Sequence, residues 1–215
     1  MIPPNSSLTT PWRVGIFALL ALVMVATRSH LLTDHFFPLP DASWAVFFIA
    51  GFYLRGSFRW AFPALMGLAV AIDYVVISRQ GLGFWEHYCV SPAYWFLVPS
   101  YAALWFGGSW LRSRHTGLHV RELALLIASA IVVTSVCYLI SNGSFYWLSQ
   151  SWITANPSAP VRSFGGWIEN LGDWYLPFVR ATLIYIGVAA GLHVATMAAL
   201  KALAGGAKSA QSSKR

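Results

Sequence analysis

The stretch Trp60–Ile77 reads WAFPALMGLAVAIDYVVI, an apolar run in which Asp73 is the only charged residue. About 20 apolar residues in a helix cross the hydrocarbon core of a bilayer, so this run is close to the length of one transmembrane helix. Five further apolar runs lie at Trp12–Ala26, Ala42–Leu54, Pro92–Leu111, Leu123–Ile140 and Trp174–Leu203. The sequence therefore predicts an all-α integral membrane protein with six transmembrane helices, of which Ala42–Leu54 is short.

The composition agrees with a membrane protein. Of the 215 residues, 57% are apolar and only 10% are charged, and the mean hydropathy is +0.59. An ordinary soluble domain has about 25% charged residues, so a soluble domain and a disordered chain are both excluded. We expect one membrane domain over residues 1–204, followed by a flexible basic tail over 205–215.

The basic residues indicate the orientation of the predicted helices. If the N-terminus is cytoplasmic, most of the 14 Lys and Arg residues fall on the cytoplasmic side. These are Arg13, Arg55, Arg59, Arg112, Arg114, Arg121, Lys201, Lys208, Lys214 and Arg215. The exceptions, on or near the outer side, are Arg28, Arg79, Arg162 and Arg180. Because cytoplasmic loops carry an excess of Lys and Arg, this distribution predicts that both termini are cytoplasmic.

Three outer segments then hold most of the chemically versatile side chains. The segment 29–43 contains His30, Asp34, His35 and Asp41, and the segment 78–91 contains Glu86, His87, Tyr88 and Cys89. The segment 141–173 is long and rich in aromatic residues: Phe145, Tyr146, Trp147, Trp152, Phe164 and Trp167. A loop of this length is usually functional, so we interpret it either as a lid or as an apron at the level of the lipid headgroups.

Asp73 lies within two turns of the outer end of its predicted helix. A carboxylate at membrane depth is costly, so it should face the bundle interior and meet a partner. One interpretation is a polar anchor at the floor of an outward pocket, which accepts hydrogen bonds from a ligand amide or hydroxyl. The alternative is a structural bond to a neighbouring Tyr, Ser or Arg79.

Cys89 is the candidate residue that most restricts which ligands the protein could bind. It lies at a loop-to-helix junction, where unpaired N–H groups lower the pKa of a thiol. A thiolate suits a soft or borderline metal, but no second Cys or closely spaced His set is present to complete a protein-only zinc or iron–sulfur site. One thiolate is sufficient as the axial ligand of a metal held by a macrocycle, which is a corrinoid or a haem.

The remaining His and Cys residues receive structural interpretations. His193 is the one histidine inside a predicted span, and no second histidine pairs with it across the bundle as a haem would require. His115 and His119 are expected to be solvated on a basic inner loop. Cys137 is expected to pack in the interior, and a disulfide between Cys89 and Cys137 is the alternative.

Three segments resemble the BtuM-type cobalamin transporters, which are solitary relatives of the substrate-binding S-components of energy-coupling-factor (ECF) transporters. The resemblance lies in His35 with the run Asp41–Arg55 (DASWAVFFIAGFYLR), in the pair Asp73–Tyr74, and in Tyr88–Trp95 (YCVSPAYW). It covers roughly residues 30 to 100, and the last two predicted helices agree in hydropathy only.

The resemblance implies six helices in a bacterial inner membrane, both termini cytoplasmic, and a pocket open to the outside. It implies that cobalamin (vitamin B12) binds base-off with the Cys89 thiolate on cobalt, and that cyanide is removed from cyanocobalamin. Asp73 and Tyr94 would line the corrin pocket, Tyr88 adjoins the ligand, and His35, with His30 as a weaker candidate, would belong to the loop that closes on it.

The sequence also bears on whether the protein needs an energising partner and on which other functions compete with cobalamin uptake. S-components commonly dock on an energising module through small residues spaced four apart on the first helix, and the first predicted helix here lacks that spacing. The sequence also contains no Walker-type ATP site. We therefore expect no dedicated ATPase module. The competing functions are a membrane accessory or assembly subunit without a small-molecule site, and an S-component for another vitamin.

Overall fold

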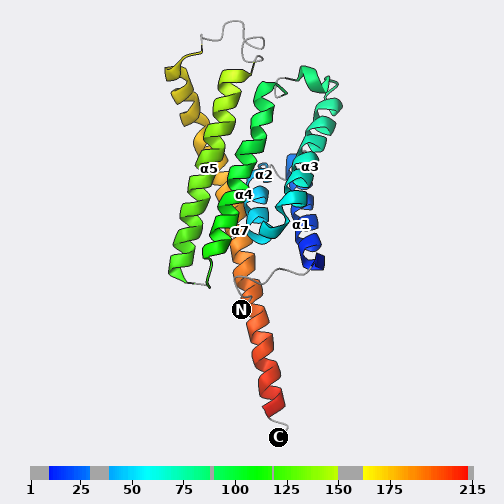
Figure 1. Cartoon of the computed structure of the whole chain (residues 1–215), viewed down its shortest axis with the longest axis vertical. Helices are drawn as coiled ribbons and strands as arrows, with labels where there is room; N and C mark the ends of the chain where they lie inside the picture. Colours follow the sequence, from blue (N-terminus) through cyan, green and yellow to red (C-terminus); the bar gives the residue numbers. More distant parts are fainter. Residues whose placement is uncertain (1–9, 30–38, 88–89, 118, 150–161, 213–215) are drawn as a thin grey trace.

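The computed structural model describes residues 10–29, 39–87, 90–117, 119–149 and 162–212. Every regular element in these residues is helical, and the described part of the chain contains six α-helices (Figure 1). They are α1 (Thr10–Arg28), α2 (Ser43–Tyr53), α3 (Phe58–Arg79), α4 (Leu97–Arg114), α5 (Val120–Leu148) and α7 (Phe164–Ser212). Short 3-10 turns η1 (Arg55–Ser57), η2 (Phe84–Glu86) and η3 (Pro92–Phe96) lie between them. The predicted all-helical class is confirmed.

Four stretches are long and apolar enough to cross a membrane: α1, the continuous stretch Arg55–Arg79, α5, and Phe164–Leu203 of α7. The other two predicted spans are also helical, but one is too short and the other is not apolar enough to be recognised as a membrane span. The first, α2, has only 11 residues. The second, α4, has 18 residues, but its Gly, Ser and Pro residues and two arginines in its last turn lower its hydropathy.

The short helix α2 is the centre of the bundle. Most of its residues are buried, including Phe47 and Phe48. It packs most extensively against α4 and also contacts α1, α3 and α7. A helix that is apolar on all sides is suited either to a protein core or to lipid, and here the neighbouring helices cover it.

Glycines allow α4 to approach both of its neighbours closely. A Cβ atom added to Gly51 of α2 would overlap the carbonyl oxygen of Trp105 in α4, and one added to Gly108 of α4 would overlap the carbonyl oxygen of Phe48. On the other side of α4, a Cβ on Gly107 would overlap the side chain of Val133 in α5. Small residues at helix contacts let backbones come together, which compensates for the weak hydrophobic drive between helices in lipid.

The predicted outer loop 141–173 is largely helical in the described residues. Helix α5 continues to Leu148 despite the sequence Ser141–Ser144 (SNGS), and α7 begins at Phe164. The Tyr138 hydroxyl donates to the carbonyl oxygen of Leu171 (2.9 Å), and the Asn142 amide donates to Asn170 (2.8 Å), so pairing with α7 holds this end of α5 helical. The interpretation as an irregular lid therefore fails for 141–148 and 164–173, and Trp152 lies outside the described residues.

Helix α7 is longer than the predicted span Trp174–Leu203 at both ends. It extends well beyond the other helices at the lower end of Figure 1, where α1 also begins. The helix continues through 205–212, where we expected a flexible tail.

We predict that Gly108→Ala destabilises the bundle, because the added methyl group meets the backbone of α2 and neither helix can withdraw without opening the core. Overpacking of this kind costs about 1–3 kcal/mol. The measurement is the apparent melting temperature of the detergent-solubilised protein. Gly67→Ala on α3 is the matched control, because nothing lies within 4 Å of its added Cβ. An equal effect of the two substitutions would contradict the close packing of α2 and α4.

Candidate functional site

Arg28, the last residue of α1, forms a bidentate ion pair with Asp73 of α3. Its Nε and Nη2 atoms donate to Asp73 Oδ1 and Oδ2, both at 2.7 Å. The two side chains are 13% and 18% exposed. A planar guanidinium facing a carboxylate in this way is among the strongest pairings available to side chains. Asp73 therefore has the partner that its depth in α3 requires.

The same guanidinium also binds the start of α2 and the second turn of α4. Its Nη1 atom donates to Asp41 Oδ2 at 2.9 Å, and to the hydroxyls of Ser43 and Tyr101 at 3.2 Å. Asp41 Oδ1 accepts bonds from the backbone N–H (2.9 Å) and hydroxyl (2.6 Å) of Ser43, the first residue of α2. One arginine thus connects α1, α2, α3 and α4 at one end of the bundle, which we call the Asp73 end.

Tyr94 of η3 completes this polar cluster. Its hydroxyl donates to Asp73 Oδ2 at 2.6 Å, so Asp73 Oδ2 accepts two bonds and Oδ1 accepts one. The Tyr94 ring lies 6.2 Å from that of Phe84 in η2, and the Phe84 ring lies 5.6 Å from that of Tyr74. These three rings lie beside the polar cluster, and Trp95, the residue after Tyr94, is largely exposed.

The structure therefore brings together Asp73 and Tyr94, two of the predicted site residues. Cys89, Tyr88, His35 and His30 lie outside the described residues. The chain is described up to His87 and again from Val90, whose N–H donates to the carbonyl oxygen of His87 at 2.8 Å.

Three members of the cluster, Arg28, Ser43 and Tyr101, were not predicted from the sequence. The expected partners of Asp73 were a neighbouring Tyr, Ser or Arg79. Tyr94 is such a Tyr, but the cation is Arg28 rather than Arg79. Arg28 ends an apolar run on the same predicted side as Asp73, which was the available signal. Tyr101 has no comparable signal, because a single Tyr inside an apolar helix is ordinarily a packing residue.

The opposite end of the bundle, which we call the Arg112 end, holds a second set of polar contacts. His115 Nδ1 lies 3.6 Å from Glu122 Oε2, and the Thr116 hydroxyl donates to Glu122 Oε1 at 2.9 Å. His115 is less solvated than expected, with 19% of its side chain exposed, because Glu122 of α5 and the rings of Phe52 and His193 lie against it; His119 is exposed, as expected. His193 Nδ1 lies 2.7 Å from the Tyr53 hydroxyl, which agrees with the predicted structural role.

Cys137 is a free thiol that is fully buried in α5, so its predicted packing role is confirmed. Among the described residues, no group of three or more His, Cys, Asp or Glu side chains is placed to hold a metal ion.

Comparison with known proteins adds no relative: no protein-family model matches the chain, and no curated protein matches it. The resemblance to the BtuM-type transporters consequently rests on the three segments quoted above.

We predict that Arg28→Gln destabilises the protein more than Asp73→Asn. Loss of Arg28 leaves two carboxylates, Asp73 and Asp41, without their cation, whereas loss of Asp73 leaves Arg28 still paired with Asp41. Removing one partner of a buried pair costs about 3–5 kcal/mol, and the double variant should recover about 1–3 kcal/mol relative to the sum of the single changes. The measurement is thermal unfolding in detergent, with Arg79→Gln as the control. Strict additivity would contradict the pairing.

Burial lowers the pKa of His115 below its ordinary value of 6.5, an effect that Glu122 partly opposes and Arg112 reinforces. The unfolded chain then binds more protons than the folded one between the lowered pKa and about 6.5, so the free energy of unfolding should decrease as the pH falls through this window. His115→Gln should remove part of this decrease. His119→Gln, on an exposed side chain, should leave it nearly unchanged, and the measurement is the melting temperature as a function of pH.

Proposed function

We propose that this protein is a cobalamin uptake protein of the bacterial inner membrane, in which Cys89 ligates the cobalt of the bound substrate. In this proposal all six α-helices lie within the membrane, both termini are cytoplasmic, and the Asp73 end faces outward. The substrate arrives from outside and binds base-off at that end. The removal of cyanide from cyanocobalamin belongs to the same proposal.

The observation that carries the proposal is the convergence of the three segments on which the resemblance rests. Asp41 belongs to the first, Asp73 to the second and Tyr94 to the third, and they are far apart in the sequence. Arg28 binds Asp41 and Asp73, and Tyr94 binds Asp73, so one residue from each segment lies at the Asp73 end. A shared site is a direct reason for three separate segments to keep a common pattern.

The contacts suggest how the described residues would serve a corrinoid. Ligand sites combine apolar and aromatic walls with a few fixed polar groups. Tyr74, Phe84 and Trp95 offer ring surfaces for the macrocycle. Asp73, whose two oxygens are both engaged by protein donors, would position Tyr94 and Arg28 rather than serve as the main acceptor for the substrate. The side chain of Asp41, which is 39% exposed, is better placed to accept a bond from an amide of the corrin ring.

The proposed ligand exchange is balanced without a reductant. The Cys89 thiolate supplies an electron pair to cobalt(III), and the dimethylbenzimidazole of the substrate leaves with its own pair. Electron donation from sulfur then labilises the cyanide on the opposite face, which leaves with its electron pair and takes a proton from water, while cobalt stays cobalt(III). Tyr88, His35 and His30 keep their proposed roles beside the thiolate and in the closing loop.

We predict that cyanocobalamin incubated with the purified protein gives the absorbance spectrum of a base-off, thiolate-ligated corrinoid, at one equivalent per chain. Cys89→Ala should abolish this spectrum, because no other thiolate is available to cobalt at the Asp73 end. Cys137→Ala is the matched control: it removes the chain's other cysteine, which is fully buried, and should leave the spectrum intact.

Two results would overturn the proposal. One is a wild-type spectrum identical to that of free cyanocobalamin under conditions in which the protein remains folded. The other is a shifted spectrum that survives in Cys89→Ala.

A further inference from the structure

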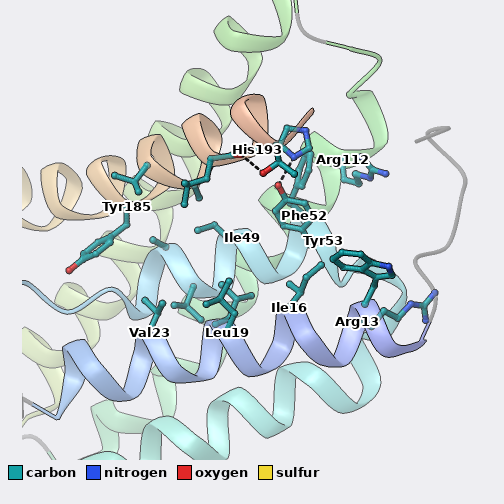
Figure 2. A pocket seen from close by; sticks show the side chains of 18 of the residues that line it. Arg13, Ile16, Leu19, Val23, Ile49, Phe52, Tyr53, Arg112, Tyr185 and His193 are labelled. Carbon is teal, nitrogen blue, oxygen red and sulfur yellow. Dashed lines mark hydrogen bonds between the residues drawn. The ribbon is translucent and has the colours of Figure 1, made fainter. Parts of the chain in front are cut away.

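Helices α1 and α7 both pack against α2 and leave a groove between them (Figure 2). The groove has a volume of about 880 Å³, within the range of small-molecule sites. Ala45 and Val46 of α2, both buried, line its base. Leu19 of α1 and Leu192 of α7 line its walls and are 60% and 64% exposed. The groove is therefore an apolar trough that opens to the surroundings of the bundle.

Three arginines line this groove: Arg13 of α1, Arg55 of η1 and Arg112 of α4. Among the described residues, no Asp or Glu lines the groove, and none of the three arginines forms an ion pair with a carboxylate. The Arg112 guanidinium instead lies over the Phe52 ring, 5.3 Å from its centroid. The groove thus carries three positive charges that the described residues do not neutralise.

The charges and the apolar length are arranged end to end. Figure 2 shows Arg13, Arg112 and the hydrogen-bonded pair Tyr53–His193 at one end of the groove, and Tyr185 at the other. The positive charges therefore lie at one end of the groove and the apolar walls extend away from them. An amphiphile, with an anionic headgroup and an apolar tail, has the same arrangement.

Measured along α1, the groove is about as long as one leaflet of a bilayer, whereas along α7 its lining residues extend further, from Tyr185 to Leu200. Along α1 its lining residues run from Trp12 to Val23. At about 1.5 Å per residue this is roughly 16 Å. Half of a hydrocarbon core of about 30 Å is roughly 15 Å. An amphiphile with its headgroup beside the arginines would therefore reach about the middle of the membrane.

We propose that this groove binds an anionic phospholipid from the leaflet on the Arg112 side. The phosphate accepts hydrogen bonds from Arg13, Arg55 and Arg112, which present the planar donors that suit a phosphate. One acyl chain lies in the trough between α1 and α7 and covers Ala45 and Val46. The inference is independent of the proposed cobalamin site, which lies at the opposite end of the bundle.

The test compares phosphatidylglycerol with phosphatidylcholine carrying the same acyl chains, added to the delipidated full-length protein and measured by native mass spectrometry. We expect phosphatidylglycerol to bind about tenfold to a hundredfold more tightly, since each arginine near an anionic lipid contributes favourably. The triple variant Arg13→Gln/Arg55→Gln/Arg112→Gln should lose this preference. The matched triple variant Arg59→Gln/Arg114→Gln/Arg121→Gln removes three exposed arginines that do not line the groove and should retain it.

A second pair of variants tests the trough with the charges intact. Ala189→Phe places a ring in the groove and should weaken binding of both lipids about tenfold or more, whereas Ala195→Phe, on an exposed position outside the groove, should not. Equal affinities of the wild-type protein for the two lipids would overturn the proposal, as would equal losses in the two triple variants. Release of phosphatidylglycerol by millimolar inorganic phosphate, or a lipid-free dimer of the chain in place of the lipid complex, would also overturn it.

Discussion

The ion pair between Arg28 and Asp73 is the interaction on which the Asp73 end depends. Asp73 lies within an apolar helix, where an unpaired carboxylate would destabilise the fold by several kcal/mol. Arg28 satisfies it from a different helix, and the same guanidinium reaches Asp41 at the start of α2. Because a guanidinium has donors on three nitrogens in one plane, it can hold α1, α3 and the residues before α2 at fixed relative positions.

The position of α2 follows from two constraints that act at its opposite ends. Near its start, Ala42 N–H donates to the Thr27 hydroxyl at 3.1 Å and the Tyr185 hydroxyl donates to the Pro40 carbonyl at 2.8 Å, so α1 and α7 both bind the chain that leads into it. Near its end, Gly51 allows the backbone of α4 to come close. A short helix held in this way does not need to span the membrane alone, which explains how 11 residues can form the centre of the bundle.

The sequence predicted the positions of the helices well, and it predicted less well which side chains contact one another. Apolar runs gave the correct number and order of α-helices in the described residues, because burial or membrane insertion requires such runs. The cost of a carboxylate at membrane depth predicted that Asp73 has a partner and that Tyr could provide it. The choice of Arg28 over Arg79 depends on how α1 crosses α3, and no periodicity within one helix reports that. The helical state of Ser141–Ser144 likewise depends on contacts with α7, so local turn propensity gave the wrong answer there.

The arginines at the two ends of the bundle differ in whether carboxylates neutralise them. Arg28 was one of four exceptions to the predicted cytoplasmic excess of positive charge, but Asp73 and Asp41 neutralise it locally. Arg162, a second exception, donates to the backbone carbonyls of Trp147 and Ser149. Arg13, Arg55 and Arg112 lack carboxylate partners among the described residues, so their charge acts outward at the Arg112 end. In the folded protein the positive charge of these three arginines is therefore less offset by carboxylates than that of Arg28 at the Asp73 end. It also means that the end predicted to meet the anionic leaflet is the end whose cations are free to bind it.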